Sequence, residues 1–191
     1  EAAGAITQTA GATVAGTKDI NNAGFDVTLD QANDLSGAID IAGANIALAC
    51  DIVIAKESAY FMQAFSKIGL IPDSGGTFTL PRLVGMARAT ALAFLGEKVP
   101  AREAVEMGMI YKYVADEDFE NEVQKLAGKL AKMPTRGLAY TKLAFNKSFT
   151  NDLETQLAVE EHLQSDASHT EDYKEGVAAF LEKRKPVFKG E

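Results

Sequence analysis

The residue types with the clearest capacity for chemistry occur together in Ile71–Thr77 (IPDSGGT). Asp73 follows a run of apolar residues, and partial burial among them would raise the pKa of its carboxyl towards that of a useful general base. Pro72 stiffens the approach to it, while Gly75 and Gly76 permit a tight turn or close contact with a ligand. An ordinary turn or helix-cap aspartate explains the same pattern equally well, so both interpretations stay open.

A second candidate segment is Ile41–Asn45 (IAGAN), where small residues open a predicted helix. The first N–H groups of a helix have no partner within it, and together with the helix dipole they can stabilise negative charge on a ligand oxygen. Small side chains would let such a ligand approach the backbone. Close packing of a buried helix against a sheet selects the same residues, and composition by itself favours that alternative.

Other reactive side chains do not form a recognisable site. His162 and His169 have no cysteine or acidic partner at metal-ligand spacing, so no metal site is expected. Cys50, the only cysteine, is expected to be a small buried hydrophobe. Gly75–Thr77 lacks the lysine that a phosphate-binding loop requires.

The composition is that of a folded soluble domain. The chain has 191 residues, of which 47% are hydrophobic and 24% charged, and it is long enough to bury a substantial core. Its formal net charge of -8 argues against nucleic acid as a partner, because a phosphate-binding surface is basic. No apolar run approaches the roughly 20 residues that span a bilayer, no signal-like segment opens the chain, and a lone cysteine fits a reducing compartment. We therefore expect no membrane association and a cytoplasmic location.

Periodicity and turn residues predict an α/β chain. Residues 1–133 form the predicted β/α core, in which residues 1–40, rich in Ala, Gly and Thr, give no clear assignment; residues 134–191 form a helical C-terminal region. Within the core, strands are predicted at residues 51–55, 58–63 and 109–114. Helices are predicted at 42–50, 81–95, 100–107, 118–133, 134–149, 151–167 and from 168 onward, with Asn151 and Ser168 as N-caps of the last two.

Four segments follow one another as they do in the crotonase (enoyl-CoA hydratase/isomerase) family: AGANIALACDIVIA, FSKIGLIPDSGGTFTLPRLVG, AREAVEMGMI and DYKEGVAAFLEKRKPVFKG. The resemblance covers Ile41 to Glu191 and is closest to the phenylacetate-pathway enoyl-CoA isomerases, which share the PD-x-GGT loop. It implies a crotonase-like spiral of ββα units with a C-terminal helical trimerisation region, assembled as a homotrimer or a dimer of trimers. The N-terminal part is then expected to be incomplete.

The resemblance also implies an acyl-CoA thioester as the substrate, so coenzyme A is part of the substrate and no separate cofactor is needed. In the family, two backbone N–H groups hold the thioester oxygen as it becomes enolate-like. One maps onto Ala42; the other maps onto Gly24 in the segment AGFDV, which lies nearer to Ala42 than the family's spacing. Phe180 and Lys183 match positions that contact the adenine and phosphates of coenzyme A. Alternatively, they are a core aromatic and a solvated helix-end lysine.

The two glutamates of the family's hydratases map onto Asn45 and Phe65, neither of which can move a proton. Together with Gly75 and Gly76, these two residues are expected to bind the substrate. The family's isomerases instead carry an acid where this chain has Asp73. One carboxylate suffices for a 1,3-proton shift from the α-carbon to the γ-carbon, so the resemblance predicts an enoyl-CoA isomerase.

Three other functions stay open. They are an enoyl-CoA hydratase (a lyase) of fatty-acid β-oxidation, an isomerase of ring-epoxidised phenylacetyl-CoA, and a non-catalytic scaffold or RNA-binding member of the family. The net charge of -8 disfavours RNA, and Asp73 would have no task in a pure scaffold.

Overall fold

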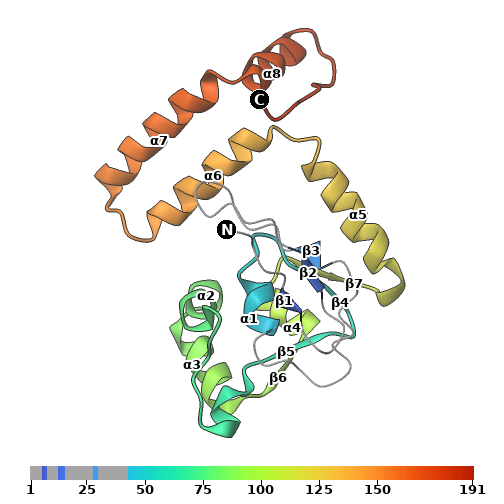
Figure 1. Cartoon of the computed structure of the whole chain (residues 1–191), viewed down its shortest axis with the longest axis vertical. Coiled ribbons are helices and arrows are strands. Elements are labelled where there is room, and N and C mark those ends of the chain that lie inside the picture. The colour runs from blue at the N-terminus through green and yellow to red at the C-terminus, as the bar shows by residue number, and fades with distance from the viewer. Residues whose placement is uncertain (1–5, 8–12, 16–27, 30–42) are drawn as a thin grey trace. The chain divides into compact units, whose positions relative to one another are not determined.

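The structure of the chain, a computed structural model, describes residues 6–7, 13–15, 28–29 and 43–191 (Figure 1). The described residues fall into two compact units, which divide between Val123 and Gln124. Ala42 and Gly24, the two predicted oxyanion donors, lie outside the described residues.

Short strands form three small sheets in the first unit. The strands β1 (Ile6–Thr7), β2 (Thr13–Ala15) and β3 (Thr28–Leu29) pair antiparallel in that order. β4 (Ile54–Lys56) pairs parallel with β7 (Lys112–Val114), and β5 (Tyr60–Met62) pairs antiparallel with β6 (Lys98–Pro100). A parallel pair of strands needs a crossover connection. The connection between β4 and β7 includes Asp73 and the helices that follow it.

The helices of the first unit are α1 (Gly43–Leu48), α2 (Gly76–Val84), α3 (Met86–Leu95) and α4 (Ala101–Glu106), with 3-10 helices at Ala64–Ile68 and Asp116–Asp118. α2 packs against both α1 and α3. The apolar faces of helices and strands meet in one core, which contains Leu48, Phe61, Leu80, Val84, Val99, Ala104, Met109 and Ile110. The packing of α1 against α2 brings the start of α2 close to the start of α1.

One predicted helix, residues 81–95, is wrong because the chain bends at Gly85. The N–H of Gly85 donates to the carbonyl of Pro81 at 3.0 Å and ends α2, and the carbonyl of Gly85 accepts from the N–H of Ala89 at 3.0 Å in α3. Gly85 has φ 79° and ψ 157°, a backbone conformation that side chains with a Cβ rarely adopt. Pro81, the first residue of the predicted helix, lies within α2 instead.

The second unit is helical, as predicted. α5 (Phe119–Leu130) leads into it, and α6 (Thr135–Ser148), α7 (Leu153–Ser168) and α8 (Glu171–Leu181) follow. α6 and α7 pack side by side as a helical hairpin (Figure 1). The N-caps of α7 and α8 are Asp152 and Thr170, whose side chains accept from N–H groups at 2.8 and 3.1 Å, so the predicted caps Asn151 and Ser168 are wrong. No helix in the described part of the chain is both long and apolar enough to cross a membrane.

Candidate active site

Asp73 lies in a tight turn immediately before α2. The N–H of Gly76 donates to the carbonyl of Asp73 at 2.7 Å and closes the turn. Between them, Ser74 (φ 49°) and Gly75 (φ 79°) both have left-handed backbone conformations. Glycine adopts this region without strain, whereas serine does so rarely, and strained residues persist only where their surroundings hold them. The predicted tight turn at the glycine pair is therefore confirmed.

A buried asparagine fastens this turn to the first turn of α1. The side-chain Nδ2 of Asn45 donates to the carbonyl of Asp73 at 3.0 Å, and its Oδ1 accepts from Nε2 of Gln63 at 2.7 Å. Asn45 is fully buried, and Gln63 is 3% exposed. Asn45 is two residues beyond Gly43, where α1 begins, and Gly43 directly follows Ala42. The turn that carries Asp73 is thus held next to the helix start that was predicted to supply an oxyanion donor.

Gly76 packs directly against Asn45. A Cβ atom at position 76 would lie 2.6 Å from Cγ and 2.7 Å from Oδ1 of Asn45, closer than real Cβ atoms come to any neighbour. Only glycine therefore fits beside the asparagine amide. A role for Gly75 or Gly76 in contacting substrate stays a prediction.

The partial burial expected for Asp73 is wrong for the described chain. Asp73 is exposed, and its apolar neighbours Ile68, Leu70 and Ile71 are 61%, 59% and 77% exposed. The reason is a left-handed residue, Gly69 (φ 73°), which ends the 3-10 helix and directs the next residues along the surface. The candidate base therefore stands beside an uncovered apolar segment.

Phe65, onto which the family resemblance maps the second hydratase glutamate, is 2% exposed inside the first unit. It lies in the 3-10 helix, where its carbonyl accepts from the N–H of Leu70 at 2.9 Å. Asn45 and Phe65 are both buried, and contact of either residue with substrate stays a prediction. Gln63 was missed from the sequence; an amide directly after the apolar strand Tyr60–Met62 is the one signal that could have indicated it.

The second group of predicted residues lies at the end of α8. Phe180 is 83% exposed, so the alternative that it is a core aromatic is wrong. Lys183 is exposed and has φ 54°, in the place after a helix where glycine is usual. The N–H of Arg184 donates to the carbonyl of Ala179 at 3.0 Å across this helix end.

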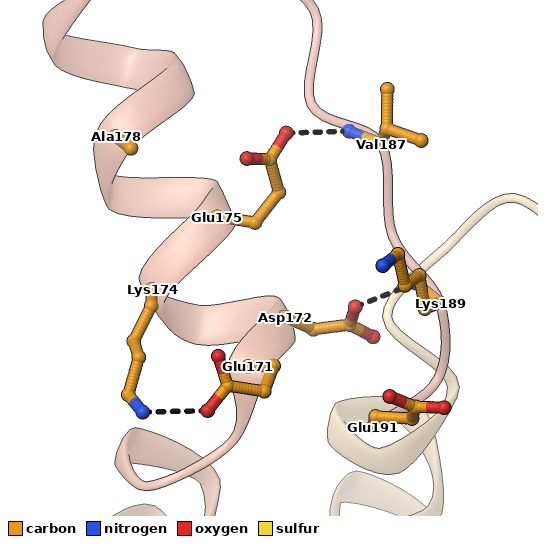
Figure 2. A pocket seen from close by; sticks show the side chains of 8 residues that line it. All are labelled: Glu171, Asp172, Lys174, Glu175, Ala178, Val187, Lys189 and Glu191. Atoms are coloured by element: carbon orange, nitrogen blue, oxygen red, sulfur yellow. Dashed lines mark hydrogen bonds and ion pairs between the residues drawn. The ribbon is translucent and has the colours of Figure 1, made fainter.

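Two carboxylates of α8 hold the segment that follows it (Figure 2). Asp172 accepts from the N–H groups of Lys189 and Gly190 at 2.7 and 2.9 Å. Glu175 accepts from both terminal nitrogens of Arg184 at 2.6 and 2.8 Å and from the N–H of Val187 at 2.8 Å. The Arg184 guanidinium, followed by the Val187 amide, lowers the pKa of Glu175 to about 2.

These contacts reduce the positive charge that the end of α8 can offer to a ligand. Arg184 also donates to Glu182 at 2.6 Å, so it is neutralised by two carboxylates of its own chain. Lys183, Lys185 and Lys189 remain as exposed cations of the segment after α8. The cavity in Figure 2, of about 500 Å³, is lined by both acidic and basic side chains and offers no simple phosphate site.

Among the described residues, no group of three or more histidine, cysteine or acidic side chains could hold a metal ion. His162 does face an acidic residue, since its Nε2 lies 3.7 Å from Oδ2 of Asp166 on the exposed side of α7. One ion pair of this kind on a helix surface is an ordinary electrostatic contact.

Comparison with known proteins identifies relatives for most of the chain. The family model described as "Enoyl-CoA hydratase/isomerase" matches residues 33–191, and one described as "Repeats of unknown function" matches residues 1–42. A "Probable enoyl-CoA hydratase" of Rhodobacter capsulatus is 51% identical over 82% of this chain and 61% of that protein. The "1,2-epoxyphenylacetyl-CoA isomerase" of Escherichia coli is also 51% identical, over 82% of this chain and 60% of that protein.

The chain belongs to the enoyl-CoA hydratase/isomerase family. Solved structures agree: an enoyl-CoA hydratase from Bacillus anthracis is 37% identical with a TM-score of 0.74, and covers 78% of this chain and 58% of its own. An enoyl-CoA hydratase from Polaromonas sp. JS666 has the same TM-score at 36% identity. The predicted crotonase-like fold is confirmed. The chain spans about three-fifths of the length of the curated family relatives that it matches.

Proposed function

We propose that this family member is an enoyl-CoA isomerase, with Asp73 as the base that moves a double bond by a 1,3-proton shift. The supporting observation is the hydrogen bond from Asn45 to the carbonyl of Asp73, at 3.0 Å. It fastens the turn of the candidate acid to the helix start at which the family resemblance places an oxyanion donor, Ala42. A base beside an oxyanion site is the arrangement that enolate chemistry requires.

The reaction needs one proton acceptor and one oxygen-binding site. The carboxylate of Asp73 takes a proton from the α-carbon of a 3-enoyl-CoA, and the electron pair of that C–H bond moves into the thioester carbonyl. The resulting dienolate oxygen is held by backbone N–H groups. The carboxyl of Asp73 then returns the proton to the γ-carbon, which re-forms the carbonyl and leaves a 2-enoyl-CoA. Atoms and charge balance without any co-reactant, so the proposal includes no resident cofactor.

Hydration is the less favoured activity because both expected proton carriers are missing. Asn45 stands at the position of one hydratase glutamate, and its amide is engaged by Gln63 and Asp73. Phe65, at the other position, is apolar and buried. Activation of a water molecule needs a group that can accept its proton, and neither residue can do so.

The acyl-CoA would place its adenine and phosphates near the end of α8. Phe180 is exposed and offers a stacking surface, while Lys183 and Lys185 offer positive charge to phosphate. In the family such groups often come from a neighbouring subunit, so this part of the proposal includes a homotrimer or a dimer of trimers.

A second candidate function is isomerisation of ring-epoxidised phenylacetyl-CoA. It is favoured by the 51% identity to the E. coli protein that bears the name of this activity. This reaction would use the same oxygen-binding site, but the acyl group would contain a ring instead of a linear chain.

Direct assays distinguish these activities. We expect the purified protein to convert 3-enoyl-CoA to 2-enoyl-CoA, followed by the absorbance of the conjugated thioester, and to hydrate crotonyl-CoA far more slowly. Faster hydration than isomerisation would overturn the proposal in favour of a hydratase. Turnover of epoxidised phenylacetyl-CoA alone would identify the second candidate, and no binding of any acyl-CoA by calorimetry would indicate a non-catalytic protein.

A further inference from the structure

We propose that Asn45 is a positioning residue, which orients the Asp73 base through the main chain and is itself oriented by Gln63. This inference rests on the proposed function, because it assigns a task to Asn45 only if Asp73 is the base. It replaces the expectation that Asn45 contacts the substrate.

Contacts of its own carboxylate do not fix the direction of the Asp73 side chain. Within the described residues, its carboxylate has no hydrogen bond or ion pair, and the residue is exposed. Its main chain, in contrast, is held at the carbonyl by two donors, Nδ2 of Asn45 at 3.0 Å and the N–H of Gly76 at 2.7 Å. Fixing this peptide group restricts the direction of the Cα–Cβ bond of Asp73, so the two donors limit the space that its carboxylate can reach.

The two hydrogen bonds of the Asn45 side chain need a donor on one side and an acceptor on the other, which an amide provides. A carbonyl can only accept, so Asn45 must turn its NH₂ group towards Asp73. Its Oδ1 then faces Gln63, which must present its own NH₂ group. A carboxylate at position 45 could still fill the space, but it would direct an acceptor at the carbonyl of Asp73 and lose that bond.

The surroundings leave Asn45 little freedom to move. It is fully buried, and the missing side chain of Gly76 gives it the space that it occupies. At the Gln63 end of this network, one acceptor lacks a partner. Oε1 of Gln63 is buried and accepts no hydrogen bond from the described residues. A buried acceptor without a donor destabilises the fold, and such costs are tolerated at functional sites.

The test compares two asparagine-to-aspartate variants in the full chain. Asn45→Asp keeps the size of the side chain but removes the donor to Asp73. Asn151→Asp is the matched control, because Asn151 also belongs to an asparagine–glutamine pair, donating from Nδ2 to Oε1 of Gln156 at 3.0 Å in the second unit. The measurements are kcat and KM for isomerisation of 3-enoyl-CoA, the Kd of a saturated acyl-CoA, and the melting temperature.

We expect Asn45→Asp to lower kcat by about 10- to 100-fold, as a misplaced base would, while KM and the Kd change by less than about threefold. Asn151→Asp should leave kcat unchanged. A purely structural role would instead weaken acyl-CoA binding together with kcat, whereas a lower melting temperature is expected in either case because the new carboxylate is buried. Unchanged kcat in Asn45→Asp would overturn the inference.

Two further variants resolve the remaining outcomes. If Asn45→Asp does not fold, Gln63→Met takes its place, because it removes the group that orients Asn45 without adding charge. A lower kcat at unchanged KM in this variant supports the inference. An unchanged kcat overturns it. Asp73→Asn separates the two proposals. An active Asp73→Asn overturns the proposed function and this inference together, whereas an inactive Asp73→Asn with a fully active Asn45→Asp overturns the inference alone.

Discussion

At the scale of single residues, Asp73, the proposed base, follows an exposed apolar segment. Ile68, Leu70 and Ile71 present apolar side chains to solvent beside the carboxylate. An acyl group laid over them would remove apolar surface from water, at about 25 cal/mol per Å² buried. The same cover would also exclude water from the surroundings of the carboxylate. We therefore expect the burial that the sequence suggested for Asp73 to come from the ligand.

Asp73→Asn tests the base itself. The amide keeps the size of the side chain but cannot accept a proton, so isomerase kcat should fall by about 10²- to 10⁴-fold. The affinity for a saturated acyl-CoA, measured by calorimetry, should stay nearly unchanged because the main-chain donors remain. Undiminished turnover would exclude Asp73 as the base.

Gly76→Ala tests the contact between α2 and Asn45. The added methyl group would overlap the Asn45 amide, so we expect a loss of about 1–3 kcal/mol in the free energy of unfolding and a lower isomerase kcat. Gly128→Ala is the control. Gly128 is exposed within α5 and has nothing within 4 Å of an added Cβ, so alanine there should stabilise the helix by about 0.5–1 kcal/mol. Equal melting temperatures of the two variants would contradict the prediction.

The sequence was sufficient to predict the turn that carries Asp73, but not the side chains that hold this turn in place. Asp73 and Gly75 were recognisable because a carboxylate between apolar residues and a glycine pair is a local signal. Gln63 was not, because its importance comes from a hydrogen bond to a residue 18 positions away. The exposure of Asp73 depends equally on tertiary structure.

At the scale of secondary-structure elements, periodicity placed most helices and strands but not their ends. The strand predicted at residues 51–55 is β4 at Ile54–Lys56, because Asp51 and Ile52 remain outside the ladder with Lys112–Val114. The division of residues 81–95 into α2 and α3 was missed because a single glycine inside a helical pattern is often tolerated. Gly85 breaks the helix through its backbone angles, which composition does not reveal.

The contacts between Glu175 and the segment that follows α8 should weaken at low pH. Glu175 has a folded-state pKa of about 2 against an ordinary 4.5, so its contribution to stability is present above about pH 4.5 and is lost as the pH falls through about 2. We expect the melting temperature to decrease over this pH range, and Glu175→Gln to reduce the decrease by removing the titrating group. Glu171→Gln, which changes only an exposed pair with Lys174, should keep it. An identical pH dependence in Glu175→Gln and the unmodified protein would contradict the assignment.

At the scale of the whole molecule, the groove between α6 and α7 in the second unit is lined by large exposed apolar side chains. Phe145 and Leu157 are 66% and 55% exposed and line the groove between α6 and α7. The family resemblance predicts a trimer, and burial of these side chains against a second copy would supply apolar contact area for it.

Leu157→Lys tests this assembly. A charge in the groove should shift the sedimentation coefficient towards that of a monomer, because a lysine ammonium is costly to bury without a partner. Ala158→Lys adds the same charge to an exposed position of α7 that does not line the groove, and should leave the sedimentation coefficient unchanged. Equal sedimentation of both variants would locate any self-association elsewhere.

The close approach of Gly76 to Asn45 also has a consequence for how such enzymes can diverge. A larger residue at position 76 would exclude the Asn45 amide, because the added Cβ would overlap it. Among descendants of such a chain, we expect a larger residue at position 76 to appear only together with a change at position 45.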